Sequence, residues 1–185
     1  PSGFPLNFNN AIDRMMKDEM DKLRSKDVKL HPIEISGKEL VLSLNNGLGK
    51  WRQSSHGLCY QWGEDLMLKG VLDDVWEDSE GNLVVVDFNS TASHRLMESL
   101  PRWSDKIERQ LSFYSYLLTQ LGYTVSNESI IFYVVGKIKK DGLSKQMEFD
   151  YQKFIVRNDM AWIDPTVQRA LDALKSNDAP QSSER

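Results

Sequence analysis

Apolar side chains recur every three or four positions over residues 9–26. The residues that make up this stripe are Ile12, Met15, Met16, Met20 and Leu23. A period near 3.6 residues places such side chains on one face of a helix and the polar side chains on the other. We therefore predict an amphipathic helix over residues 9–26 whose methionine-rich face packs into the core.

Short runs rich in β-branched and aromatic residues follow this helix. They span residues 39–44, 58–62, 66–76 and 82–88. Such runs, bounded by polar residues and glycine, predict β-strands. The last two runs are separated by residues 77–81, which end in Gly81 and have the composition of a tight turn, so we expect them to form a hairpin.

The second half of the chain predicts a helix, two strands and a further helix. The helices are expected over residues 104–121, where Gly122 ends the pattern, and over residues 165–175, where Pro165 fits the first turn. The strands are expected over residues 129–135 and 147–156. This order predicts an α/β or α+β fold with a central mixed sheet flanked by helices.

Length and composition narrow the class of protein. A chain of 185 residues is long enough for one domain with a full core, which we place at residues 1–175, followed by a flexible polar tail at residues 176–185. Because Cys59 is the single cysteine, an internal disulfide and an iron–sulfur cluster held within this chain are both excluded. We expect an intracellular, cytoplasmic protein, since no apolar run reaches the roughly 18 residues of a membrane span and no signal-peptide pattern is present.

The balance of acidic and basic side chains limits how the chain can bind nucleic acid. There are 27 acidic and 23 basic side chains, which gives a formal net charge of −4. Sequence-independent binding of nucleic acid depends on Lys and Arg side chains that displace counterions. Contact with a polyanion is therefore expected to be local rather than spread over the whole surface.

Carboxylates interrupt both strands of the predicted hairpin. Asp73 and Asp74 are adjacent, so only one of them can face a given site, because neighbouring strand residues point to opposite faces. On the partner strand Asp87 ends an apolar run, and Asn89 lies on the same face two residues later. The hairpin would make Asp73 and Asp87 antiparallel neighbours, and a hard divalent cation can neutralise their repulsion. The alternative is that Asp73 or Asp74 faces solvent and that Asp87 only ends its strand.

Three spaced motifs in this region resemble those of the PD-(D/E)XK nuclease superfamily. They are Gly70-x-x-Asp73, Asp87-x-Asn89 and, one turn apart on the next helix, Gln110-x-x-x-Tyr114. The likeness is to the RecB-like branch, which includes CRISPR-adaptation exonucleases, and it extends over about residues 7–137. The resemblance implies a restriction-endonuclease-like αβββαβ core.

The resemblance also implies roles for the motif residues. Asp73 and Asp87 would bind Mg²⁺ or Mn²⁺ together with the backbone carbonyl of Phe88. Gln110 and Tyr114 would orient the substrate strand or the site. The activity implied is metal-dependent hydrolysis of phosphodiester bonds in DNA, either single-stranded or at duplex ends, with no membrane partner.

Two further features of the branch have less direct counterparts here. A metal ligand is often present on the first helix, where Asp13 is the nearest candidate; the alternative is an acid favoured by the helix dipole. The branch also frequently carries cysteines that hold an iron–sulfur cluster. Such cysteines would lie in flanking segments outside residues 1–185.

Asn89 stands where the family's motif has a lysine. Asparagine keeps a hydrogen-bond donor but carries no charge, and losses of this kind cost on the order of 10²- to 10⁴-fold in rate. Three interpretations follow from this difference. Another lysine takes over the role of the motif lysine, with Lys106 favoured over Lys69, or Asn89 is an engineered substitution. The third interpretation is that the protein is an inactive relative. An inactive relative would be a DNA-binding module or a subunit of a larger complex. A structural domain with surface acids is a further alternative.

Basic side chains flank the predicted site and are candidates for contacts with DNA phosphates. They are Arg102, Arg109, Lys137, Lys139 and Lys140. Phosphate contacts position a protein on nucleic acid without reading its sequence. The alternative is that the lysines form an ordinary solvated turn.

Overall fold

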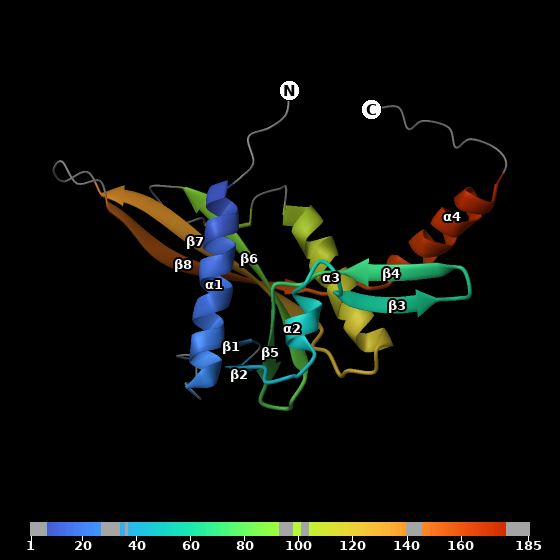
Figure 1. The fold of residues 1–185 in the computed structure, drawn as a ribbon, viewed down its shortest axis with the longest axis horizontal. Coiled ribbons are helices and arrows are strands. Elements are labelled where there is room, and N and C mark those ends of the chain that lie inside the picture. The colour runs from blue at the N-terminus through green and yellow to red at the C-terminus, as the bar shows by residue number, and fades with distance from the viewer. Residues whose placement is uncertain are drawn as a thin grey trace, which may run out of the picture.

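The computed structural model describes residues 7–26, 34–35, 37–92, 98–100, 104–139 and 146–176. These residues form a mixed α and β structure, shown in Figure 1. Its elements are α1 (Asn7–Ser25), β1 (Glu34–Ile35), β2 (Lys38–Leu42), α2 (Leu48–Trp51), β3 (Leu58–Trp62), β4 (Leu66–Gly70), β5 (Asp74–Asp78), β6 (Leu83–Ala92), α3 (Asp105–Gln120), β7 (Glu128–Lys139), β8 (Gln146–Arg157) and α4 (Ile163–Lys175). None of the helices among these residues is both long and apolar enough to cross a membrane.

The central sheet has the strand order β1-β2-β5-β6-β7-β8. β6 and β7 pair in parallel, and the other neighbours in this sheet pair antiparallel. Parallel neighbours need a crossover connection, which α3 provides between β6 and β7. β3 and β4 form a separate antiparallel pair, which Figure 1 shows on the same side of the molecule as α3 and α4.

Two apolar layers cover the two faces of the sheet, because successive residues of β6 point to opposite faces. Val84 and Val86 pack with Met16 and Met20 of α1 in one layer. Val85 lies in the other layer, which includes buried residues of α2, α3 and α4. β6 is therefore buried on both faces, which is typical of a central strand. The carboxylate of Asp87 belongs to this buried strand.

Several sequence predictions are confirmed. The first helix is α1, and its predicted core face is buried at Ile12, Met16 and Met20, although Met15 is 39% exposed. The hairpin of β5 and β6 is present, and Gly81 in its turn has φ 80°, a backbone conformation that glycine adopts without strain. The helix predicted over residues 104–121 is α3. It ends before Gly122, whose φ is 91°. Of the predicted polar tail, residues 177–185 lie outside the described residues.

The single strand predicted over residues 66–76 is wrong. The run contains two strands, β4 and the start of β5, separated by residues 71–73. β4 pairs with β3, whereas β5 pairs with β2 and β6, so the chain changes sheets between them. Asp73 consequently lies at a bend immediately before β5 rather than inside a strand.

Candidate functional site

Asp73 and Asp87 approach each other at the open end of the β5–β6 hairpin. Asp74 lies opposite Val86, so the register brings the preceding residue, Asp73, toward Asp87. The backbone N–H of Phe88 donates to Asp73 Oδ2 over 3.0 Å. This hydrogen bond ties the bend before β5 to β6 at the position of the second acid.

Asp87 is a buried carboxylate, with 7% of the residue exposed. Its two oxygens accept hydrogen bonds from neutral amides, Asn89 Nδ2 on Oδ2 and, over 3.4 Å, Gln110 Nε2 on Oδ1. Burial and then the charge of Asp73 raise the pKa of Asp87 to about 7, against the opposing influence of Asn89 and Lys17. The described contacts of Asp87 therefore satisfy its hydrogen bonding without bringing a cation into contact with it.

Gln110 and Tyr114 come from adjacent turns of α3 and form one unit. Gln110 Nε2 lies 2.9 Å from Tyr114 Oη and also donates to Asp87. Burial, followed by the charges of Asp87 and Asp73, raises the pKa of Tyr114 to about 12, so its hydroxyl keeps its proton at neutral pH. The amide of Gln110 thus links the phenol to the buried carboxylate.

Gly70, at the end of β4, packs directly against the ring of Tyr114. A Cβ atom at this position would lie 2.7 Å from Cε1 and 2.8 Å from Cδ1 of Tyr114. Real Cβ atoms do not approach a ring so closely, because protein interiors are already packed to van der Waals contact. The glycine of the Gly70-x-x-Asp73 motif therefore has a steric role. Because it has no side chain, the ring of Tyr114 on α3 can pack against it and lie beside the acids.

Lys17 of α1 enters the site and was not singled out by the sequence analysis. Its Nζ lies 2.7 Å from Asp73 and 2.9 Å from Asp13, and its side chain is 22% exposed. Burial alone would lower the pKa of Lys17, but the charges and hydrogen bonds of Asp73 and Asp13 outweigh burial and raise it. The sequence did contain a signal, because Lys17 lies one helical turn after Asp13 and so shares its face.

Asp74 has a structural environment that separates it from its neighbour Asp73. It is fully buried, and its carboxylate pairs with Arg24 of α1 and, over 2.8 Å, with Arg52 after α2. Burial raises the pKa of Asp74, and the two arginines oppose that shift. Arg52 also donates from Nε to the backbone carbonyl of Asp73 over 2.7 Å. The ion pairs of Asp74 with Arg24 and Arg52 therefore fix the bend that contains Asp73.

Neither lysine proposed as a replacement for the missing motif lysine contacts Asp73 or Asp87 among the described residues. Lys106 is exposed in the first turn of α3. Lys69 is exposed on β4, and its ammonium donates to the carbonyls of Ser54 and Ser55 over 2.9 and 3.3 Å. The lysine that the structure places against the site is Lys17.

The basic residues predicted to contact phosphate do not converge on the acids where the structure describes them. Lys137 pairs with Asp150 of β8. Arg109 stacks over the ring of Trp162, with its guanidinium carbon 4.4 Å from the ring centroid. The backbone of Lys139 lies in β7, but its side chain, like all of Arg102 and Lys140, lies outside the described residues.

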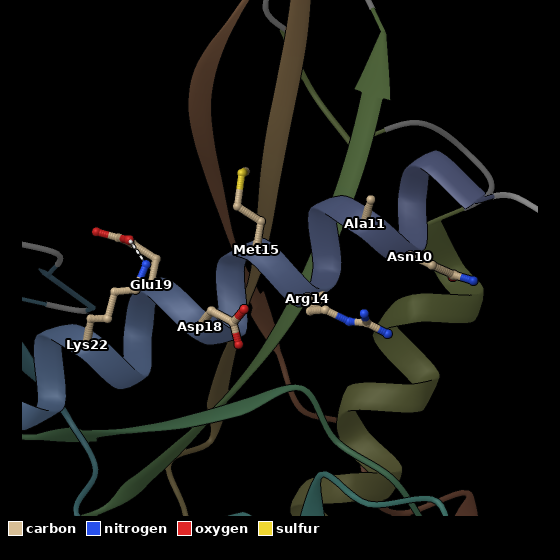
Figure 2. A pocket seen from close by; sticks show the side chains of 7 residues that line it. All are labelled: Asn10, Ala11, Arg14, Met15, Asp18, Glu19 and Lys22. Atoms are coloured by element: carbon tan, nitrogen blue, oxygen red, sulfur yellow. Dashed lines mark ion pairs between the residues drawn. The ribbon is translucent and has the colours of Figure 1, made fainter.

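A groove of about 550 Å³ runs along the outer face of α1. Figure 2 shows its described lining, which comes from α1 alone and mixes charges: Arg14 and Lys22 with Asp18 and Glu19. Glu19 and Lys22 form an exposed ion pair there. Nothing in this lining belongs to the Asp73 and Asp87 site.

Asp13, Asp73 and Asp87 do not form a ready-made metal cluster. Within the described part of the chain, no three His, Cys, Asp or Glu side chains are arranged as a group that could hold a metal ion. In place of such a group, the Lys17 ammonium lies between Asp13 and Asp73. Comparison of the chain with protein-family models, with curated proteins and with solved structures found no match.

Proposed function

We propose that this protein is a divalent-metal-dependent nuclease that hydrolyses phosphodiester bonds in DNA at the Asp73 and Asp87 site. The observation that carries the proposal is the state of Asp87. It is a buried carboxylate beside a second carboxylate, its hydrogen bonds come from neutral amides, and its pKa is raised to about 7. A divalent cation would offset both the burial and the repulsion.

The donor set suits Mg²⁺ or Mn²⁺, which prefer oxygen ligands. Asp73 and Asp87 would supply carboxylate oxygens. The N–H of Phe88 points at Asp73, and in an extended strand the carbonyl of the same residue points to the same neighbour. This direction supports the Phe88 carbonyl as a third ligand. A bound ion would supply an acidified water and would stabilise the charge that develops on the phosphate.

The surrounding side chains would position these ligands. Gln110 fixes one oxygen of Asp87 and the hydroxyl of Tyr114, and Asn89 fixes the other oxygen. Tyr114 keeps its proton and can donate to a substrate oxygen. Asp13 and Asp73 both pair with Lys17. Because Asp73 is the acid that the hairpin register brings toward Asp87, we assign Asp73 to the metal and Asp13 to holding the lysine.

The order of elements supports a restriction-endonuclease-like core as part of this proposal. With β1, α2, β3 and β4 left out, the chain runs α1, β2, β5, β6, α3 and β7: a helix, three antiparallel neighbours, a crossover helix and a parallel strand. This is the αβββαβ order that the resemblance implies. The two acids fall on the second and third of these strands, or immediately before them.

The test is cleavage of linear single-stranded and duplex DNA by the purified chain with Mg²⁺, Mn²⁺ or EDTA. Asp73→Asn and Asp87→Asn should each lower metal-dependent cleavage by at least about 100-fold, since each removes a ligand charge that supports several kcal/mol of transition-state stabilisation. Asp18→Asn is the matched control, because Asp18 is an exposed acid on the outer face of α1 (Figure 2). Titration calorimetry should show Mn²⁺ binding that both site variants weaken. Undetectable Mn²⁺ binding by the unaltered chain would reject the proposal.

A catalytically silent DNA-binding module, alone or in a larger complex, is the second candidate. It is favoured by the contact between the Lys17 ammonium and Asp73, which neutralises that carboxylate without any metal. Asn89 in place of the motif lysine points the same way. This candidate predicts DNA binding in EDTA, with neither cleavage nor Mn²⁺ binding.

A further inference from the structure

We infer that Lys17 is the catalytic cation of this site, with its ammonium contacting the phosphate that is hydrolysed. The inference rests on the proposed function and assigns to α1 a role that the hairpin and α3 do not supply. No residue of the three motifs brings a positive charge to the acids.

The position of Lys17 is firmly held. The ammonium lies 2.9 Å from Asp13, one turn earlier on the same helix. It lies 2.7 Å from Asp73, at the bend before β5. Met16 and Met20 anchor the same stretch of α1 in the core. A side chain held from two sides loses little further conformational freedom when a substrate arrives, which is the condition for preorganised electrostatic stabilisation.

Charge balance gives the ammonium a function. Asp13, Asp73 and Asp87 carry three negative charges when ionised, and one divalent cation leaves one of them uncompensated. A phosphodiester, itself an anion, would then enter a negative site. Lys17 brings the site to neutrality, so that the phosphate is no longer repelled and the extra charge of the transition state meets a cation.

Three other cations among the described residues, Arg24, Arg52 and Lys69, are engaged elsewhere. Arg24 and Arg52 are paired with the buried Asp74. Lys69 donates to backbone carbonyls at Ser54 and Ser55. Among the described residues, Lys17 is the cation that contacts the Asp73 carboxylate through its side chain.

Lys17 would remain an ammonium throughout the reaction. The oxygen of water forms a bond to phosphorus, and the bond from phosphorus to the leaving sugar oxygen breaks. Of the two water protons, one stays on the product phosphate and one ends on the leaving oxygen. Lys17 donates a hydrogen bond to a non-bridging phosphate oxygen and supplies charge, and no proton or electron passes through it.

The experiment moves the positive charge of Lys17 to another residue. Lys17→Met keeps the aliphatic stem and removes the ammonium, and Lys17→Met/Asn89→Lys returns a lysine to the site from β6. The matched control is Lys17→Met/Gln120→Lys, which has the same net charge with the new lysine on an exposed position at the far end of α3. The readouts are kcat and KM for DNA cleavage in Mn²⁺, Mn²⁺ affinity by calorimetry, and thermal melting.

Lys17→Met should lower kcat by about 10²- to 10³-fold, the usual effect of removing one electrostatic donor. It should raise Mn²⁺ affinity severalfold, because a cation next to the metal position is gone. The Asn89→Lys double variant should recover at least about tenfold in kcat, or roughly 1.4 kcal/mol, and reverse the gain in affinity. The Gln120→Lys double variant should resemble Lys17→Met in both readouts.

Wild-type kcat in Lys17→Met, or equal behaviour of the two double variants, overturns the inference while leaving the proposed function intact. A wild type that neither cleaves DNA nor binds Mn²⁺ overturns the proposed function itself. Lys17→Arg covers the case in which Lys17→Met fails to fold, since it keeps a cation in a longer, planar group. A folded Lys17→Arg that loses at least about tenfold in kcat supports direct contact with the phosphate, and one with wild-type kcat contradicts it.

Discussion

Asp73 and Asp74 are adjacent in sequence, and the structure uses them differently. Asp73 faces Lys17 and the N–H of Phe88, whereas Asp74 is fully buried between Arg24 and Arg52. Arg52 connects the two acids, because it also binds the Asp73 carbonyl. The buried ion pair therefore positions the bend that contains the partly buried Asp73.

Removing the buried carboxylate should be costly. Asp74→Ala leaves two arginines without their buried partner, and breaking such a pair typically lowers the free energy of unfolding by about 3–5 kcal/mol. Asp65→Ala is the control, because Asp65 pairs with Lys175 where both side chains are 58% exposed, and exposed pairs contribute about 1 kcal/mol or less. Urea unfolding of both variants measures the difference. Equal destabilisation would show that the Asp74 pair is dispensable for the fold.

Asp87 makes stability depend on pH. Its pKa is about 7 in the folded protein against an ordinary value of 3.8, so between these values the folded state binds a proton that the unfolded state has lost. The free energy of unfolding should therefore be highest at the acidic end of this range and fall as pH rises through 7, by up to about 4 kcal/mol if the whole shift is realised. Asp87→Asn should flatten this dependence and be more stable than wild type at pH 8 in EDTA, as measured by urea unfolding. A wild-type stability that rises between pH 5 and 7.5 would contradict the prediction.

The sequence pointed to Asp73 and Asp87 because a tight hairpin makes its two ends neighbours, and to Gln110 and Tyr114 because residues one helical turn apart share a face. A strand or one helical turn determines which neighbours share a face. The site also contains Lys17, which reaches Asp73 across 56 positions of sequence. Such a contact depends on how α1 docks on the sheet, and no local period encodes that docking.

At the scale of elements, the chain leaves one sheet and enters another between β4 and β5. Residues 66–76 look continuous because both strands have the same apolar and aromatic composition. Their separation follows from pairing partners, β3 for β4 and both β2 and β6 for β5, and strand composition does not specify partners. The helices and the hairpin were predictable because periodicity and turn glycines act locally.

Gly70 should be intolerant of even the smallest side chain. Gly70→Ala pushes a methyl group into the ring of Tyr114 and so displaces the hydroxyl that Gln110 binds. We expect a loss of about 1–3 kcal/mol in the free energy of unfolding and a fall in cleavage of about tenfold or more from misplaced groups. Thermal melts and initial rates measure the two effects.

Gly49→Ala is the matched control for Gly70→Ala. Gly49 lies in α2, and a Cβ there would meet nothing within 4 Å. Alanine should be neutral or stabilising by up to about 1 kcal/mol at this helical position. If Gly70→Ala were as harmless as Gly49→Ala, the packing of β4 on α3 would not determine the position of Tyr114.

At the scale of the whole molecule, the net charge is −4, and two of the basic side chains predicted to contact DNA are engaged within the described part of the protein. Lys137 is engaged by Asp150, and Arg109 is stacked on Trp162. We expect the plot of log affinity against log salt to have a slope of magnitude below about 3, compared with roughly 6–10 for proteins with many phosphate contacts. Fluorescence anisotropy with the Asp87→Asn variant measures this slope without cleavage. A slope of about 6 or more would show an extended phosphate-binding surface.

Because the acids lie at the open end of the β5–β6 hairpin and the turn lies at the other, the two ends should tolerate changes in length very differently. Extra residues between Ser79 and Gly81 lengthen a loop while leaving the pairing of Asp74 with Val86 in place, at a small entropic cost. One residue inserted between Leu83 and Val86 would instead turn Asp87 to the opposite face of the sheet. A reporter peptide or an affinity tag therefore belongs in the turn. Insertions or deletions between Leu83 and Asp87 should instead disrupt the site.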